Sequence, residues 1–122
     1  MSIPDIESLL KAELASYGTS QWTGEIGGQE ITLYAKPLSP ADNSRVLRKF
    51  PNFNTTMEFG GMVEYIILKA TDADGKRVFN ESHRVLLSRM SSDKVAEIFN
   101  GLFGDQLEDD SDEGGDDKVG NS

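Results

Sequence analysis

The chain has 122 residues, no cysteine and a net charge of −9, from 21 acidic and 12 basic side chains. The absence of cysteine excludes disulfides, thiolate metal sites and cysteine nucleophiles, and the negative charge without a basic patch argues against a nucleic-acid ligand. The longest uncharged apolar stretch, Tyr65–Leu68, is far shorter than the roughly 20 residues that span a bilayer. Because the N-terminus also lacks the pattern of a signal peptide, we expect a soluble intracellular protein without a membrane contact.

Acidic residues are concentrated at the C-terminal end of the chain. Residues 105–122 hold eight acids and one lysine, whereas residues 1–104 hold thirteen acids and eleven bases. A run of like charges with few apolar groups cannot bury enough surface to offset the entropy lost on ordering. The sequence therefore predicts one small domain over 1–104 and a disordered acidic tail over 105–122.

The N-terminal segment has the periodicity of a helix. Apolar residues recur at helical spacing over 4–17, and Gly18 follows as a stop signal. The predicted helix carries one apolar stripe, which consists of Ile6, Leu9, Leu10 and Leu14.

A β-hairpin is predicted next, with strands over 20–27 and 29–36. The second strand alternates apolar and polar residues, and Gly27 and Gly28 supply the positive φ angles of a tight turn. Because a lone hairpin is only marginally stable, the face that carries Trp22 must pack on helices.

Two helices are predicted in the middle of the chain. Ser39 is a good cap and Pro40 suits the first helical turn, so a helix should begin there and end near Lys49. Residues 56–71 are ambiguous, because the run Val63–Leu68 is rich in residues that favour strands. Its apolar residues nevertheless recur at helical spacing, so a helix is predicted, weakened at its start by two glycines.

A turn and two further helices should complete the domain. Asp72–Gly75 has the composition of a turn, Asn80 is a suitable cap for a short helix that ends at Met90, and the last helix should end at Gly104. The residues expected to be buried on the short helix are Val85, Leu86 and Met90. The predicted fold class is therefore α+β, with an N-terminal helix, one antiparallel hairpin and about four packed helices.

No group of residues points to an enzyme. Catalysis needs a nucleophile, a base and an oxyanion site together, and the single histidine, His83, lacks such neighbours. Asp72, Asp74 and Glu81 have the spacing of three ligands in a calcium-binding EF-hand loop. Ala70 stands at the first ligand position, so an ordinary turn is preferred and a calcium-responsive module is the weakest alternative. We predict no catalytic residue, metal site or cofactor.

Two groups of residues have alternative interpretations. Arg45, Arg48 and Lys49 are interpreted as a solvated helix face, with contact to an acidic partner or to the chain's own tail as the alternative. The larger aromatic residues are interpreted as core, with an exposed partner groove as the alternative; they are Trp22, Phe50, Phe53, Phe59 and Phe103.

Four features over residues 20–104 occur in a distinctive order. A hairpin strand runs into Lys36–Asp42, a short basic helix follows, an apolar helix ends in the turn Asp72–Gly75 before Phe79, and a closing helix contains Val95–Asn100. This order resembles that of the tail assembly chaperones of long-tailed phages. The first helix is not covered by the resemblance and is treated as an addition.

The resemblance implies that the protein binds the long, apolar, helical tape-measure protein and keeps it soluble while the tail tube assembles. It implies the tail tube protein and self-association as further contacts, and a location in the host cytoplasm rather than in the mature virion. The alternative is another phage interaction module, either a tail-completion protein or an acidic inhibitor of a basic partner.

The candidate partner contacts lie on the hairpin and on the last helix, and both groups are also interpreted as core. On the hairpin they are Trp22, Leu33 and Tyr34; on the last helix they are Val95, Ile98, Phe99, Leu102 and Phe103.

Overall fold

The structure, a computed structural model, describes residues 5–115, with residue 105 and residues 107–115 described by their backbone alone. This part of the chain contains six α-helices, a 3₁₀ turn and one antiparallel hairpin, which confirms the predicted α+β class. The elements are α1 (Ile6–Ser16), β1 (Ser20–Ile26), β2 (Gln29–Ala35), α2 (Pro40–Lys49), α3 (Phe53–Thr56), α4 (Phe59–Lys69), η1 (Glu81–His83), α5 (Arg84–Arg89) and α6 (Ser92–Gly115).

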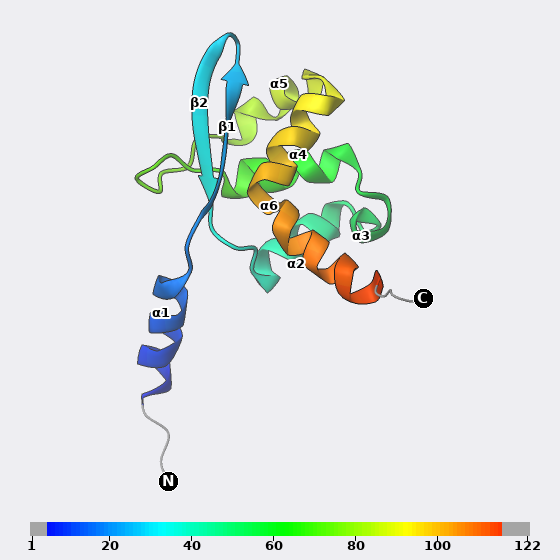
Figure 1. The fold of residues 1–122 in the computed structure, drawn as a ribbon. Coiled ribbons are helices and arrows are strands. Elements are labelled where there is room, and N and C mark those ends of the chain that lie inside the picture. The colour runs from blue at the N-terminus through cyan, green and yellow to red at the C-terminus, as the bar shows by residue number, and fades with distance from the viewer. Residues whose placement is uncertain (1–4, 116–122) are drawn as a thin grey trace.

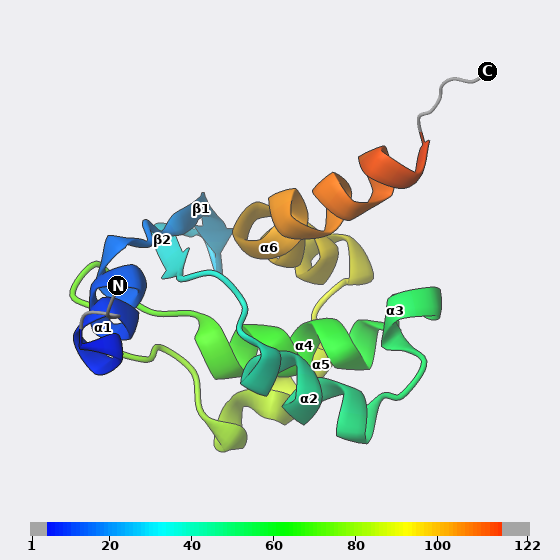
Figure 2. The same cartoon turned by 90° about the horizontal axis from the view of Figure 1, so that it is seen from below.

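The elements form two layers, and α1 stands apart from both. Figure 2 shows the hairpin and α6 in one layer and α2, α4 and α5 in the other. α4 is the centre of the second layer, because it packs against α6 across the core and against α2 and α5 at its sides. α1 projects from the start of β1, away from the two layers (Figure 1).

The hairpin forms as predicted and packs on α6. Gly27 and Gly28 have φ angles of 65° and 84°, which suit a tight turn. Trp22 is buried, and its indole Nε1 donates a hydrogen bond of 3.0 Å to Glu97 of α6. A Cβ atom on Gly101 would lie 2.7 Å from the indole ring, so the glycine permits the close approach of strand and helix.

The core contains an aromatic cluster between α4 and α6. Phe53, Tyr65, Phe99 and Phe103 are buried, and the centroids of neighbouring rings lie 5.3 to 5.9 Å apart in tilted or edge-on pairs. Such pairs contribute about 0.5–1.5 kcal/mol each beyond the burial of their area. Phe53 comes from α3, a one-turn helix that was not expected from the sequence.

α4 confirms the helical interpretation of the ambiguous stretch. Every residue from Gly61 to Ile67 is buried, and a helix with neighbours on several sides carries apolar residues at most positions, which explains its strand-like composition. Its two glycines have a packing role. A Cβ atom at Gly60 would lie 2.7 Å from the ring of Phe50, and one at Gly61 would lie 2.3 Å from the ring of Phe53.

The burial predicted for the short helix is wrong at two residues. Asn80 caps the 3₁₀ turn as expected, because its side chain accepts a hydrogen bond of 2.9 Å from the Ser82 N–H. α5 buries Leu87, whereas Val85 and Leu86 are each 63% exposed. A helix of one and a half turns presents only one side to α4, so two of its three consecutive apolar residues face outward.

The last helix continues beyond its predicted end. α6 ends at Gly115 rather than at Gly104, so the predicted stop is wrong. A glycine within a helix costs only about 1 kcal/mol, and the next turn makes a contact of its own, since Gln106 accepts a hydrogen bond of 2.9 Å from the Leu38 N–H. The boundary between domain and acidic tail stays a prediction, and residues 116–122 lie outside the described residues.

The turn after α4 is confirmed. The carboxylate of Asp72 accepts hydrogen bonds from the N–H groups of Asp74 and Lys76, at 2.9 and 3.0 Å, and so holds the turn. Glu81, the most distant of the three residues with calcium-ligand spacing, pairs instead with Arg84. Within residues 5–115, no three or more His, Cys, Asp or Glu side chains that the structure describes are grouped as a metal site requires.

Candidate interaction surfaces

The apolar stripe of α1 lies on the surface of the molecule. None of the residues of α1 is buried, and its four large apolar side chains are 47 to 63% exposed. An isolated helix of this length is marginally stable in water, and a continuous exposed apolar face is typical of a binding site. We call this surface the α1 stripe; it consists of Ile6, Leu9, Leu10, Leu14 and the neighbouring Tyr17.

One acidic residue lies within the α1 stripe. Leu10 precedes Glu13 by three residues, Leu9 precedes it by four, and Tyr17 follows it by four. Helix geometry therefore places these side chains around Glu13. Its carboxylate accepts a hydrogen bond of 2.7 Å from the Tyr17 hydroxyl, and this bond raises the pKa of Tyr17. A partner that covers the stripe must therefore offer Glu13 a polar or cationic group, because burial of an unpaired carboxylate is costly.

A second exposed apolar surface lies on α5, and a buried carboxylate fixes its orientation. Glu64 of α4 pairs with Arg84 of α5 at 2.6 Å and with Lys49 of α2 at 3.5 Å. The bond to Glu81 and the pairing with Glu64 raise the pKa of Arg84 against the opposing effect of burial. Since a buried charge without its partner is strongly unfavourable, these contacts hold α5 so that its two exposed apolar residues face solvent.

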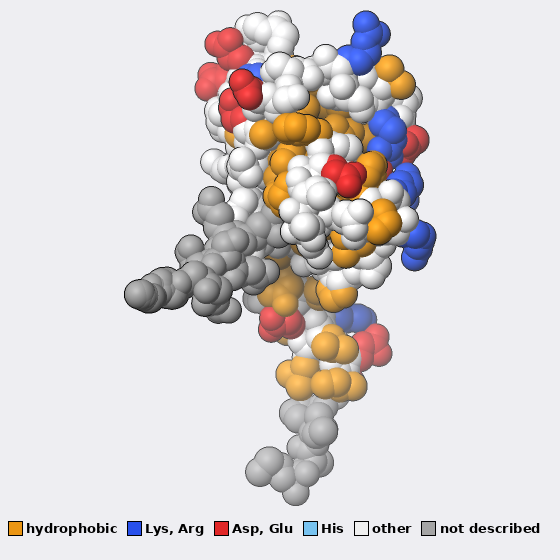
Figure 3. All heavy atoms as spheres, turned by 90° about the vertical axis from the view of Figure 1, so that its right-hand side faces the viewer, with side chains coloured by type: hydrophobic (Ala, Val, Ile, Leu, Met, Phe, Trp, Pro, Cys, Tyr) orange, Lys and Arg blue, Asp and Glu red, His pale blue; other side chains and the backbone are white. Residues whose placement is uncertain are grey.

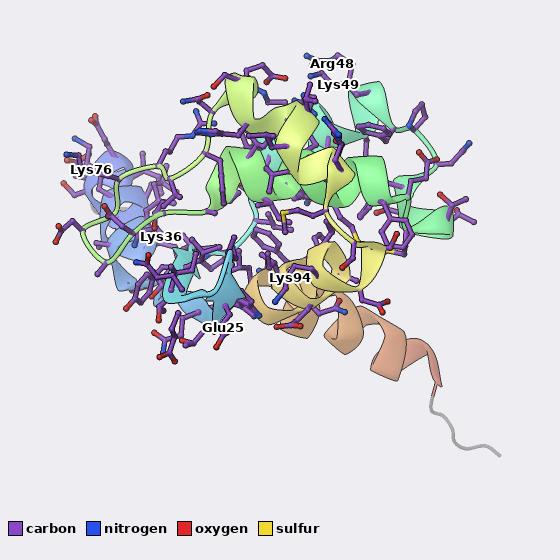
Figure 4. The ribbon with its side chains drawn as sticks, turned by 90° about the horizontal axis from the view of Figure 1, so that it is seen from above. Glu25, Lys36, Arg48, Lys49, Lys76 and Lys94 are labelled. Carbon is purple, nitrogen blue, oxygen red and sulfur yellow. The ribbon has the colours of Figure 1, made fainter. Side chains whose placement is uncertain are left out.

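Basic side chains gather on the exposed faces of α2 and α5. Figure 3 shows Lys and Arg side chains in a row along one edge of the molecule, and Figure 4 shows Arg48 and Lys49 together at the outer edge of α2. The α2 residues line an open recess of 410 Å³. The hydrogen bond from Arg84 lowers the pKa of Glu81. Burial opposes this shift, whereas the charges of Arg84, Lys49 and Arg45 add to it. We call this surface the basic face; it consists of Arg45, Arg48, Lys49 and Arg84.

Hollows also lie outside these surfaces. One has a volume of 130 Å³ between α4, α5 and α6, and the half-exposed Phe59 lines it beside Met90. This volume suits one apolar side chain rather than a whole ligand. Another, of 430 Å³, has Tyr34 and Lys69 in its wall. Lys69 pairs with Asp42 at 2.9 Å, and Lys36, Asp72 and Asp74 also line this hollow.

The structure places most of the predicted partner contacts in the core. Tyr34 is half-buried and lines the larger hollow. The other seven residues are at most 6% exposed and so cannot contact a partner on the surface of this fold, which confirms the alternative interpretation as core; they are Trp22, Leu33, Val95, Ile98, Phe99, Leu102 and Phe103.

The α1 stripe and the exposed apolar residues of α5 lie where the sequence assigned no site. α1 was predicted as a helix with an apolar stripe but without a role, and its central Glu13 is the signal that distinguishes this stripe from a core-facing one. On α5, the run Val85–Leu87 was the available signal, because three consecutive apolar residues on a short helix cannot all face the core. Arg84 of α5 lies near the cluster on α2, because Arg84 and Lys49 both pair with Glu64.

Comparisons with protein-family models, with curated proteins and with solved structures found no match to this chain. In the part of the chain that the structure describes, no helix is both long and apolar enough to cross a bilayer.

Proposed function

We propose that this protein is an assembly chaperone that binds apolar helical segments of a tape-measure protein and keeps them soluble during assembly of a phage tail. The observation that carries the proposal is the α1 stripe, a continuous apolar helix face that the fold leaves uncovered. Such a face can pair with an amphipathic helix of a client. The net charge of −9 supports the solubility that such a protein needs.

The segments that carry the family resemblance also support the proposal, because they form one connected body. Lys36–Asp42 links β2 to α2, Asp72–Gly75 forms the turn after α4, and Val95–Asn100 lies on α6 against that helix. α1 lies outside the resemblance, so this binding face is an addition particular to this chain.

Co-expression with the tape-measure protein encoded beside its gene tests the proposal. We expect the chain to raise the soluble fraction of that protein and to co-purify with it. The variant L10Q/L14Q should lose this effect, whereas the control A12Q/A15Q, which changes the opposite side of the same helix, should retain it. If the tape-measure protein stays insoluble beside the parent chain, the proposal fails and another phage interaction module becomes the better interpretation.

A further inference from the structure

The two exposed surfaces complement each other in chemistry. The α1 stripe is apolar with Glu13 among its leucines, and residues 5–16 hold three acids and one base. α5 exposes Val85 and Leu86, and the basic face lies beside this helix. Apolar contact and opposite charge therefore coincide, and this combination favours one orientation of binding.

Within one chain α1 and α5 lie near opposite ends of the hairpin. α1 leaves β1 at its first residue, whereas Ile26 and Gly27 at the hairpin turn share a hollow with Met90, the residue that follows α5. The seven residues of β1 span about 23 Å, and Figure 1 shows α1 below the hairpin while α5 lies near its upper end. The structure leaves each surface free for a different molecule.

We propose that α1 of one copy docks on α5 and the basic face of a second copy. The α1 stripe then covers Val85 and Leu86, and Glu13 meets a cation of the basic face. Because the two surfaces differ, each copy gives one contact and receives one. Such a head-to-tail interface adds copies in series, which close into a ring or extend as a filament according to the rotation between copies.

The expected contact is small and reversible. An eleven-residue helix is about 16 Å long, and one face of such a helix buries less area than a permanent interface requires. A reversible contact suits the proposed function, because a second copy can cover the α1 stripe until a client helix displaces it. The purpose given to this contact rests on that proposed function. The contact itself forms without the client, so it is tested on the purified chain alone.

Sedimentation of the purified full chain over a range from low micromolar to submillimolar concentration measures this association. The average mass of the parent should rise with concentration beyond that of a dimer. The variants L10Q/L14Q and V85Q/L86Q, which change opposite partners of the contact, should each remain at one chain mass. The controls A12Q/A15Q and S88Q add the same side chain elsewhere on α1 and α5 and should associate like the parent.

An equimolar mixture of the two variants gives the decisive result. Only the intact α1 of V85Q/L86Q can dock on the intact α5 of L10Q/L14Q, so the mixture should reach two chain masses and stop there. A parent that remains monomeric at every concentration overturns the proposal. So does a mixture that remains monomeric, or a V85Q/L86Q variant that associates like the parent, since both would place the contact elsewhere.

The charge in the contact is tested by Glu13→Gln. This variant should weaken association severalfold, and its association should respond less to added salt than that of the parent. An unchanged affinity and salt dependence would contradict the role of the basic face. Loss of client rescue with intact self-association refutes only the proposed function, and the reverse result refutes only this inference.

Discussion

Helices α1 and α6 both carry an apolar stripe at helical spacing, yet the stripe of α6 is buried and that of α1 is exposed. The α6 stripe, which includes Phe99 and Phe103, faces α4 and the hairpin. The α1 stripe contains Glu13 among its leucines and faces solvent. Spacing therefore predicts a helix in both cases, and the acidic residue inside the stripe distinguishes the exposed helix from the buried one.

Truncation of the α6 stripe should have the largest effect on stability. Phe99 is fully buried and its ring neighbours those of Phe53, Tyr65 and Phe103. Phe99→Ala should lower the free energy of unfolding by about 3–5 kcal/mol, measured by urea denaturation followed by circular dichroism. The matched change Leu10→Ala on α1 should shift it by less than about 0.5 kcal/mol. Equal effects of the two changes would show that α1 packs on the body.

The glycines of α4 test how closely the core is packed. Gly61→Ala should destabilise the fold by about 1–3 kcal/mol, although alanine favours helix, because the added Cβ atom would lie 2.3 Å from the buried ring of Phe53. Gly18→Ala serves as the control, since nothing lies within 4 Å of its added Cβ atom. Thermal unfolding of both variants measures the difference, and a stabilised Gly61→Ala variant would contradict this packing.

The capping box of α2 gives a smaller effect that depends on pH. Burial alone would raise the pKa of Asp42, but hydrogen bonds from Ser39 and the ion pair with Lys69 lower it. Asp42→Ala should cost about 0.5–2 kcal/mol near neutral pH. Because the folded-state pKa is the lower one, this contribution is complete above the unfolded value of about 4 and is lost as the pH falls through the folded value.

Urea denaturation at a series of pH values measures this effect. The difference between the parent and the Asp42→Ala variant should shrink as the solution becomes acidic. Asp74→Ala, at an exposed position in the turn, should stay within about 0.5 kcal/mol of the parent at each pH. A gap between parent and Asp42→Ala that stayed constant into strong acid would argue against the ionised cap.

The smallest effect on stability is expected at the α1 stripe itself. L10Q/L14Q should change the free energy of unfolding by less than about 0.5 kcal/mol, because both leucines are already exposed. The same variant should lose association and client binding. A loss of binding with unchanged stability would show that the α1 stripe serves binding alone. A large loss of stability at dilute concentration would show instead that it packs on its own chain.

Most of the fold followed from local patterns in the sequence. The hairpin, α2 and α4 were predicted because turn glycines, a capping box and helical periodicity act over a few residues. The exposure of Val85 and Leu86 was not predicted, because it depends on the ion pair between Glu64 of α4 and Arg84, which orients α5. The continuation of α6 past Gly104 likewise depends on a contact with a distant segment.

The candidate site was harder to predict than the fold for the same reason. Burial of the α6 stripe and exposure of the α1 stripe are decided by which elements pack together, and both stripes look alike in spacing. Only Glu13 differs locally. An acidic residue at the centre of the stripe separates α1 from α6 in the sequence.

The single tryptophan of the chain gives this molecule a built-in optical reporter. Trp22 is buried between hairpin and α6, with the Lys94 ammonium 5.7 Å from its ring centroid and Glu97 on its indole nitrogen. Its fluorescence should change when strand and helix separate and stay silent when α1 orders or detaches. Emission and far-ultraviolet ellipticity recorded on one sample therefore resolve the two regions without any label.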